Sequence, residues 1–308
     1  AFGVLFAAAY AVVLALRLHD GQTMGQAVRT MPPIFLIWIA YLLVMTRYLN
    51  HVAGERLARF RAAMDVDDEE YGQLAYRLTT MPAGPAFWNG VAWLAVACVA
   101  FAFAYPDIAR LHYARWEIVC TVLTYFFGGG IVYHTIHQLR EVSRLHARSA
   151  RIDLYHLDPL HAFAGLTAQT ALGWIFLLYL TSHIVPREIL ESGFGATWIV
   201  VMAVAVAAFV VPLTGMHGRM VDAKREAIAA TNDRLKRLTT ERNEQIDRGA
   251  FDRLDDYDKA TAAVLAEHER LSKISTWPWN TGTLRGFVSA LLLPTVVRLV
   301  QEAAQRLT

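Results

Sequence analysis

The residues best suited to chemistry lie between Thr124 and Gly165, a stretch that holds five of the chain's eleven histidines. His134 and His137 are three residues apart, so they share one face of a helix. With His156, Asp158 or His161 from the loop that follows, they would supply the three ligands that a zinc site needs at minimum. The sequence therefore suggests a metal site at His134, His137 and His161. Histidines at a membrane surface also simply donate hydrogen bonds to headgroups or carbonyls, so we keep both alternatives.

A haem is the second cofactor that these histidines could hold. Bis-histidine ligation requires two imidazoles at one depth on facing helices. The topology predicted below leaves two such pairs, His134 with His217 and His134 with His51. No motif in the sequence requires either haem or zinc.

Three consecutive glycines precede His134. In membrane helices, glycine most often allows two helices to pack closely. Glycine backbone could instead line a pore, together with the hydroxyl and amide groups that lie inside the apolar runs. The residues predicted for helix packing or for a pore are Thr124, Gly128, Gly129, Gly130, Gln169 and Thr170.

Arginines follow the histidines at helical spacing. Arg140, Arg144 and Arg148 recur every four residues, and Arg151 comes three residues later. This spacing forms a cationic stripe on a helix just outside the membrane. Each basic residue near a bilayer surface contributes about 1 kcal/mol to the binding of anionic lipid. We therefore predict a lipid-headgroup surface there.

Several classes of protein are disfavoured by what the sequence lacks. It contains no G-x-S-x-G, H-E-x-x-H or P-loop motif, so nothing indicates an enzyme. No Asp, Glu or Lys lies deep inside an apolar run, although ion-coupled carriers usually keep such a group at mid-membrane. We expect lipid rather than nucleic acid as the partner.

The elements that must position these residues are long apolar segments. The 308 residues are 55% hydrophobic and only 18% charged. Six stretches approach or reach the roughly 20 residues that a helix needs to cross a bilayer. The sequence thus predicts an all-α, polytopic integral membrane protein with six transmembrane helices. The stretches are Ala1–Leu16, Met31–Leu49, Ala86–Tyr105, Trp116–Tyr133, Ala162–Ile184 and Ala196–Met216.

The basic residues predict the orientation of these helices. Most of the 29 Lys and Arg lie at or beyond the ends of the second, fourth and sixth stretches. Positive charge stays on the cytoplasmic side of a membrane. The predicted protein is therefore a multi-pass protein of a prokaryotic inner membrane, with both termini in the cytoplasm.

Three domains follow along the chain: a transmembrane domain over residues 1–216, a cytoplasmic helical hairpin over 217–274 and an interfacial amphipathic tail over 275–308. Juxtamembrane helices are expected at about 50–80 and 135–155. The acidic run 65–70 fits the capped N-terminus of a helix better than a calcium loop, because its sixth position is Glu70 rather than glycine.

The hairpin is predicted as two polar helices, about 222–243 and 252–273, joined near Gly249. Val221, Ile228 and Leu235 recur at coiled-coil spacing in the first of them. In the tail, the apolar run 286–297 is too short to span comfortably and contains Pro294. We expect it to lie in the interface; a seventh span, which would place the last residues outside, is the alternative.

These features support two functions of different classes. The first is a homo-oligomeric channel whose pore is lined by threonine, glutamine and glycine backbone and is gated by the cytoplasmic helices. The second is a non-conducting membrane scaffold or sensor that acts through the hairpin. A His-liganded metal or haem protein of the membrane is a further alternative.

Overall fold

The computed structural model describes residues 34–104, 115–148, 152–184 and 194–307, with a few isolated positions before residue 24. Every regular element in these ranges is a helix, which confirms the all-α class. The elements are α3 Ile34–Phe60, η1 Arg61–Ala63, α4 Asp68–Thr79, α5 Ala83–Ala104, α6 Arg115–Arg148, α7 Ala162–Ile184, α9 Phe194–Val210, η3 Val211–Leu213, α10 Thr214–Asp247, α11 Leu254–Lys273 and α12 Thr281–Leu307.

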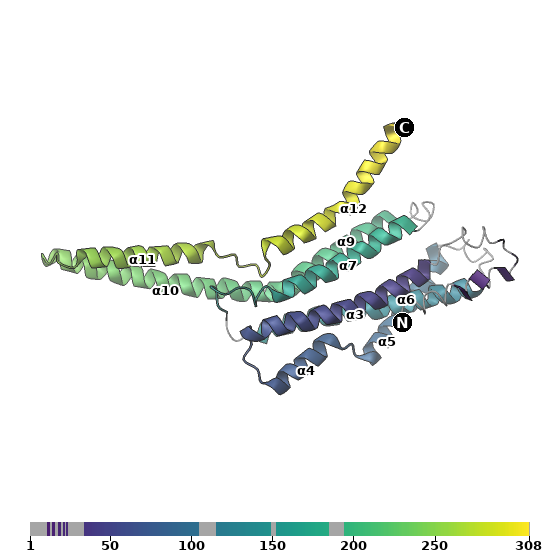
Figure 1. The fold of residues 1–308 in the computed structure, drawn as a ribbon, viewed down its shortest axis with the longest axis horizontal. Coiled ribbons are helices and arrows are strands. Elements are labelled where there is room, and N and C mark those ends of the chain that lie inside the picture. Colours follow the sequence, from purple (N-terminus) through teal and green to yellow (C-terminus); the bar gives the residue numbers. More distant parts are fainter. Residues whose placement is uncertain are drawn as a thin grey trace.

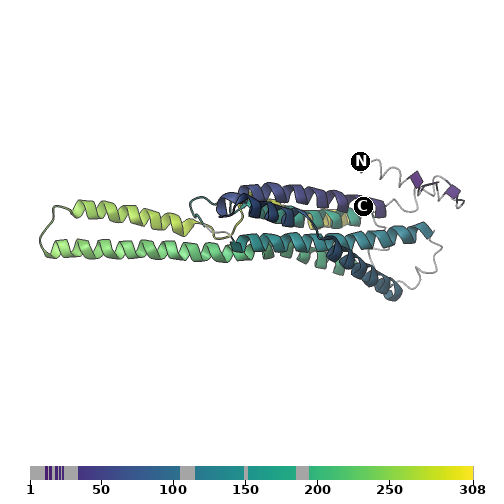
Figure 2. The ribbon, with the colours of Figure 1, turned by 90° about the horizontal axis from the view of Figure 1, so that it is seen from below.

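The helices form an elongated molecule with two parts. In the first part, α3 packs on α6 and α7, α5 packs on α6, and α9 packs on α7. Figure 1 shows this bundle in one half of the molecule and the pair α10 and α11 extending from the other half. Figure 2, turned by 90°, shows α10 and α11 side by side along their length. We call the first part the bundle and the second part the hairpin.

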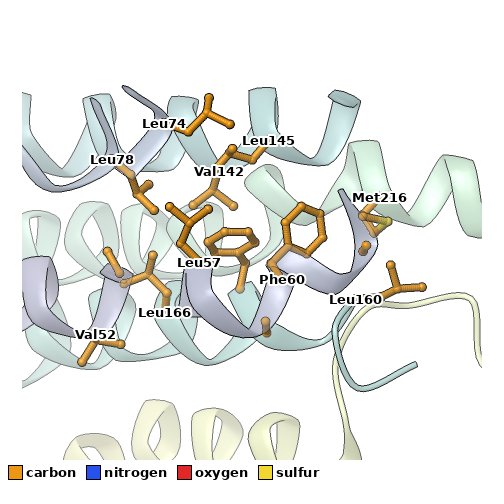
Figure 3. Packing of buried hydrophobic residues seen from close by; sticks show 14 of the residues in the cluster. Val52, Leu57, Phe60, Leu74, Leu78, Val142, Leu145, Leu160, Leu166 and Met216 are labelled. Atoms are coloured by element: carbon orange, nitrogen blue, oxygen red, sulfur yellow. The ribbon is translucent and has the colours of Figure 1, made fainter. Parts of the chain in front are cut away.

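The main hydrophobic core lies where the bundle meets the hairpin. Leu57 and Phe60 of α3 are fully buried there, and Phe60 lies 5.0 Å from Phe163 between ring centres. Figure 3 shows the neighbouring side chains converging from several helices: Val52, Leu57, Phe60, Leu74, Leu78, Val142, Leu145, Leu160, Leu166 and Met216.

A second core joins α7, α9 and α12. Phe287 of α12 stacks on Phe209 of α9 at 4.3 Å between ring centres. The surrounding residues are small, so the helices approach closely; they include Ala164, Ala168, Ala171 and Ala205.

Two local predictions can be compared with the helix ends. Asp67 is the N-cap of α4, and its Oδ1 accepts a hydrogen bond from the Glu70 backbone N–H at 2.8 Å. Arg61 of η1 pairs with Asp68, the first residue of α4. The acidic run therefore caps a helix, as expected.

At the other end of the molecule, Gly249 adopts φ 71° in the turn between α10 and α11, a conformation that favours glycine.

Helix α12 is longer than the apolar run on which the predicted interfacial tail is based. It covers 27 residues and continues through Pro294, well beyond the apolar run 286–297. Its first half packs on α7, and Figure 1 shows its second half diverging from α7 and α9. A proline removes one backbone hydrogen bond and kinks a helix, but neighbouring contacts can hold the helix on both sides.

Two helices are long and apolar enough to cross a membrane, judged by length and composition over the described residues. They are Ala162–Thr181 and Met202–Asp247, the latter continuing through η3 into the hairpin. The first predicted stretch, Ala1–Leu16, lies largely outside the described residues. The structure thus supports association with a membrane, while the six-span topology stays a proposal.

Candidate functional site

A buried polar layer crosses the bundle at the level of His134. His134 is 2% exposed, and its Nε2 lies 2.7 Å from Oδ1 of Asn50 on α3. Because an amide oxygen only accepts hydrogen bonds, Nε2 carries the proton and Nδ1 is the acceptor. Nδ1 is buried and has no partner among the described residues.

Gln138, one turn after His134, extends this layer to a third helix. Its Nε2 donates to Asn50 Oδ1 at 3.3 Å and to the Leu78 carbonyl of α4 at 3.4 Å. The two α6 side chains thus share one acceptor on α3. The layer links α3, α4 and α6, because the Gln138 amide bonds to groups on both of the other helices.

A small cavity lies beside His134 on the side of α7. Tyr41 donates from its hydroxyl to the Gly173 carbonyl at 2.7 Å, and Trp174 Nε1 donates to Thr135 Oγ1 at 3.3 Å. The free space admits little more than one water molecule. It is too small for a porphyrin and is not a continuous path. The lining residues are Tyr41, Leu42, Met45, Thr46, Leu49, Ile131, His134, Thr135, Gly173, Trp174 and Leu177.

The three glycines of α6 have different environments. A Cβ on Gly129 would lie 2.7 Å from Trp93 Cβ and 2.9 Å from Gly90 Cα of α5, whereas Gly128 and Gly130 have no such neighbour within 4 Å. Asn89 Nδ2 also donates to the Gly129 carbonyl at 2.6 Å. Gly129 therefore serves close packing of α5 on α6 within one chain.

The remaining polar residues proposed for a pore point into the bundle. Thr170 is fully buried, and its hydroxyl donates to the Leu166 carbonyl at 2.9 Å. Thr124 is also buried, and Oε1 of Gln169 is shielded from solvent without a partner. None of these three side chains lines the cavity beside His134.

The three histidines proposed as metal ligands make separate contacts. His134 bonds to Asn50, whereas His137 Nε2 lies 3.0 Å from the Arg77 carbonyl and its ring stacks on Tyr133. His161 directly precedes α7, where burial lowers its pKa and the charge of Asp158 opposes that effect. Within the described ranges, no three His, Cys, Asp or Glu side chains lie close enough to hold a metal ion.

The arginine stripe is described in part. Arg140 is exposed, and Arg144 pairs with Glu141, whose side chain is buried beneath it. The side chain of Arg148 and the whole of Arg151 lie outside the described residues. The lipid-headgroup surface therefore stays a prediction.

Sequence reasoning missed a second polar cluster, at the point where the bundle meets the hairpin. His146 is fully buried between the rings of Phe60 and Phe163, and its Nδ1 lies 3.2 Å from the Pro212 carbonyl of η3. The pKa of His146 is lowered to about 4, chiefly by burial; the hydrogen bond to the Pro212 carbonyl opposes this shift, and the charge of Arg219 adds to it. His146 is therefore neutral at pH 7.

Arg219 connects the same two parts through the backbone. Its guanidinium donates to the His146 carbonyl at 2.7 Å and to the Ala147 carbonyl at 3.1 Å, near the end of α6. A cation at this helix end satisfies carbonyls that have no partner within the helix.

An aromatic stack completes this contact from the hairpin side. His217 of α10 stacks on Trp277 at 4.0 Å, Trp277 on Trp279 at 4.3 Å, and Trp279 on Phe209 of α9 at 5.2 Å. The ring of His217 also bonds through Nδ1 to the Thr276 carbonyl at 3.0 Å. We call His146, Arg219, His217 and Trp277 the junction. No spacing in the sequence indicated it, because His217 and Trp277 lie far apart in the chain.

No protein-family model, curated protein or solved structure matches this chain. The functional argument therefore rests on the geometry of the polar layer, the junction and the hairpin.

Proposed function

We propose that the chain is a multi-pass protein of a prokaryotic inner membrane that acts as a non-conducting scaffold or sensor. In this proposal, six helices cross the membrane and the hairpin lies in the cytoplasm, where it passes a change in the bundle to a partner. The observation that carries the proposal is the junction, which attaches the base of the hairpin to α6 and α9 through hydrogen bonds and stacked rings.

The path from membrane to hairpin is helical throughout. From Met202 to Asp247 the chain runs through α9, η3 and α10 as 46 residues of helix. Pro212 lies in η3, and its carbonyl accepts from His146. A rotation of α9 against α6 would therefore act on α10 directly, because no flexible loop separates them.

The far end of the hairpin offers a contact for a partner. Phe251 is 61% exposed and Ile246 is 39% exposed, on either side of the Gly249 turn. Aromatic side chains often anchor protein interfaces, so we assign Phe251 as the partner contact. The rest of the hairpin surface is mostly charged.

Site-specific photo-cross-linking in intact cells tests this function. A cross-linking amino acid in place of Phe251 should give a discrete adduct with a second protein, whereas the same group in place of Leu265, exposed farther from the tip, should not. Trp277→Ala should lower the adduct yield, because it breaks the junction. The purified protein in liposomes should show no ion flux above protein-free vesicles. Ion flux above that of protein-free vesicles, together with equal adduct yields at positions 251 and 265, would exclude the scaffold proposal.

The topology is tested separately by cysteine labelling. In a background with Cys98→Ala and Cys120→Ala, an impermeant thiol reagent added to intact cells should not reach Gly249→Cys. The proposed six spans leave the C-terminus in the cytoplasm, so Thr308→Cys should be protected as well. Labelling of Thr308→Cys would instead support α12 as a seventh span.

A homo-oligomeric channel is the second candidate. Gly128 and Gly130 favour it, because both leave open space on α6 where a second copy could approach. Its pore would form between protomers rather than inside one. Saturable ion flux in liposomes that is lost in Gly128→Leu, with the protomer still folded, would support the channel.

A further inference from the structure

One ring nitrogen of His134 is buried without a hydrogen-bond donor. His134 is 2% exposed, and its Nε2 donates to Oδ1 of Asn50 at 2.7 Å. Nδ1 is then the acceptor of the neutral ring, and no described residue bonds to it. Leaving a buried acceptor unpaired destabilises a fold, so a donor that reached Nδ1 would stabilise this one.

His134 also lines the cavity between α3, α6 and α7. Asn50, which accepts from Nε2, does not belong to the cavity lining. Nδ1 is therefore the nitrogen of His134 that can bond to a molecule in the cavity. The free space fits one water molecule and nothing much larger, so its occupant has a single non-hydrogen atom.

Thr46 brings a second polar group to the same cavity from α3. It lies one turn before Asn50, so both side chains are on the face of α3 that meets His134. The Thr46 hydroxyl donates to the Leu42 carbonyl of its own helix at 2.9 Å, and its oxygen keeps lone pairs that can only accept a further bond. The cavity thus presents two acceptors, Nδ1 on α6 and Oγ1 on α3, which cannot bond to each other.

The rest of the lining favours a neutral donor. Tyr41 donates from its hydroxyl to the Gly173 carbonyl at 2.7 Å, so its oxygen is a further acceptor. None of the described residues that line the cavity is Asp, Glu, Lys or Arg, so no countercharge favours an ion over a neutral molecule. Water has the right size and two O–H donors, and so can satisfy two acceptors at once. Buried waters bind to such groups, whereas purely apolar cavities stay dry.

We propose that this cavity binds one water molecule, which donates to Nδ1 of His134 and to Oγ1 of Thr46. The water extends the buried polar layer by one turn of α3, from Asn50 to Thr46, and ties α3 to α6 at two levels. It also sets the tautomer of His134: because Nδ1 accepts from the water, the ring proton stays on Nε2 and keeps its bond to Asn50. The site requires neither a protein partner nor ion conduction, so it stands apart from the proposed function.

Nuclear magnetic resonance of the isotope-labelled protein in nanodiscs tests the site. An imidazole nitrogen that accepts a hydrogen bond resonates upfield of one without a donor, so Nδ1 of His134 should show the upfield position. A cross-peak between water and the ring proton on Cε1, the carbon beside Nδ1, should identify the donor as water. An Nδ1 resonance at the position of a free acceptor in the unmodified protein would overturn the proposal.

Variants of Thr46 test the second bond of the water. Thr46→Val keeps the side-chain shape and removes the hydroxyl. The loss of one neutral hydrogen bond should shorten the residence time of the water about fivefold and weaken the cross-peak. Thr46→Ser keeps the hydroxyl and should preserve the cross-peak.

Thr181→Val is the matched control. The Thr181 hydroxyl also bonds to the carbonyl four residues earlier, but Thr181 does not line the cavity, so its loss should leave the cross-peak intact. An unchanged cross-peak in Thr46→Val, or an equal loss in Thr46→Val and Thr181→Val, would contradict the proposed site. If Thr46→Val does not fold, Thr46→Ala is compared with Thr46→Ser by the same criterion.

Discussion

The bundle and the hairpin are held together by different interactions. In the bundle, Leu57, Phe60 and Phe163 are fully buried against neighbouring helices. The hairpin relies on exposed pairs such as Arg234 with Glu267 at 3.3 Å and Arg242 with Asp258 at 3.1 Å. Exposed pairs contribute about 0–1 kcal/mol each, whereas a fully buried apolar side chain contributes about 1.5–3 kcal/mol.

The burial of side chains decreases along the hairpin from its base to its tip. Met216 and Met220 of α10 and Leu271 of α11 are buried at its base, and Thr231 is the remaining buried residue among the described parts of these helices. Local stability should therefore decrease from the junction to the Gly249 turn. A base fixed to the bundle and a more readily opening tip suit a part that transmits motion and adapts to a partner.

The largest effect is expected from filling the contact between α5 and α6. Gly129→Leu places a side chain where Trp93 and the α5 backbone already lie, and we expect a loss of at least about 3 kcal/mol in the free energy of unfolding. Gly128→Leu is the control, since it has open space. Thermal unfolding in detergent distinguishes them; equal melting temperatures would show that close packing at Gly129 does not matter.

A pH effect is expected from His146, on the bundle side of the junction. The pKa of His146 is about 4 in the folded protein and about 6.5 when unfolded. Between these values the unfolded state binds more protons, so stability is lost as the pH falls. We expect about 2 kcal/mol less stability at pH 5 than at pH 7.

The contribution of His146 is isolated by two variants. His146→Gln should remove most of this difference, whereas His51→Gln, at an exposed position, should leave it in place. Denaturant unfolding at the two pH values measures it. An unchanged pH dependence in His146→Gln would assign the effect to other groups.

Breaking the aromatic stack should weaken the base of the hairpin without unfolding the bundle. Trp277→Ala removes the ring between His217 and Trp279, and we expect the local opening free energy to fall by about 1–2 kcal/mol. Hydrogen exchange near Leu271 should become about 5–30 times faster. Phe251→Ala at the tip should leave that exchange unchanged. Equal effects of both variants would contradict a graded hairpin.

The smallest effect is expected from the exposed pairs. Arg242→Ala removes the pair with Asp258, and the change in stability should stay below about 1 kcal/mol. Raising the salt concentration should reduce even this difference, because exposed charges are screened. A larger loss would mean that ion pairs, rather than the junction, hold the hairpin.

Local features were predictable because they depend on neighbours in the chain. Long apolar runs predict helices, and every regular element among the described residues is a helix. Asp67 caps α4 through a bond within one turn, and Gly249 allows the positive φ between α10 and α11. Such features need no information about distant residues.

The sites depended on contacts between helices, which spacing alone does not specify. Successive residues of a helix point about 100° apart, so only one of three consecutive glycines faces α5; the structure shows that it is Gly129. His134 and His137 share a helix face as predicted, yet one meets Asn50 and the other meets the Arg77 carbonyl. A shared face gives a common direction, not a common ligand.

The sequence by itself determined the helical class and the distribution of charge, because both follow from residue type and short-range order. The tertiary structure alone decided that His146 meets the Pro212 carbonyl and that Arg56 lies on Gly165. Those pairs come from segments far apart in the chain. Their meeting is set by how whole helices pack, through many side chains at once, and so no single motif records it.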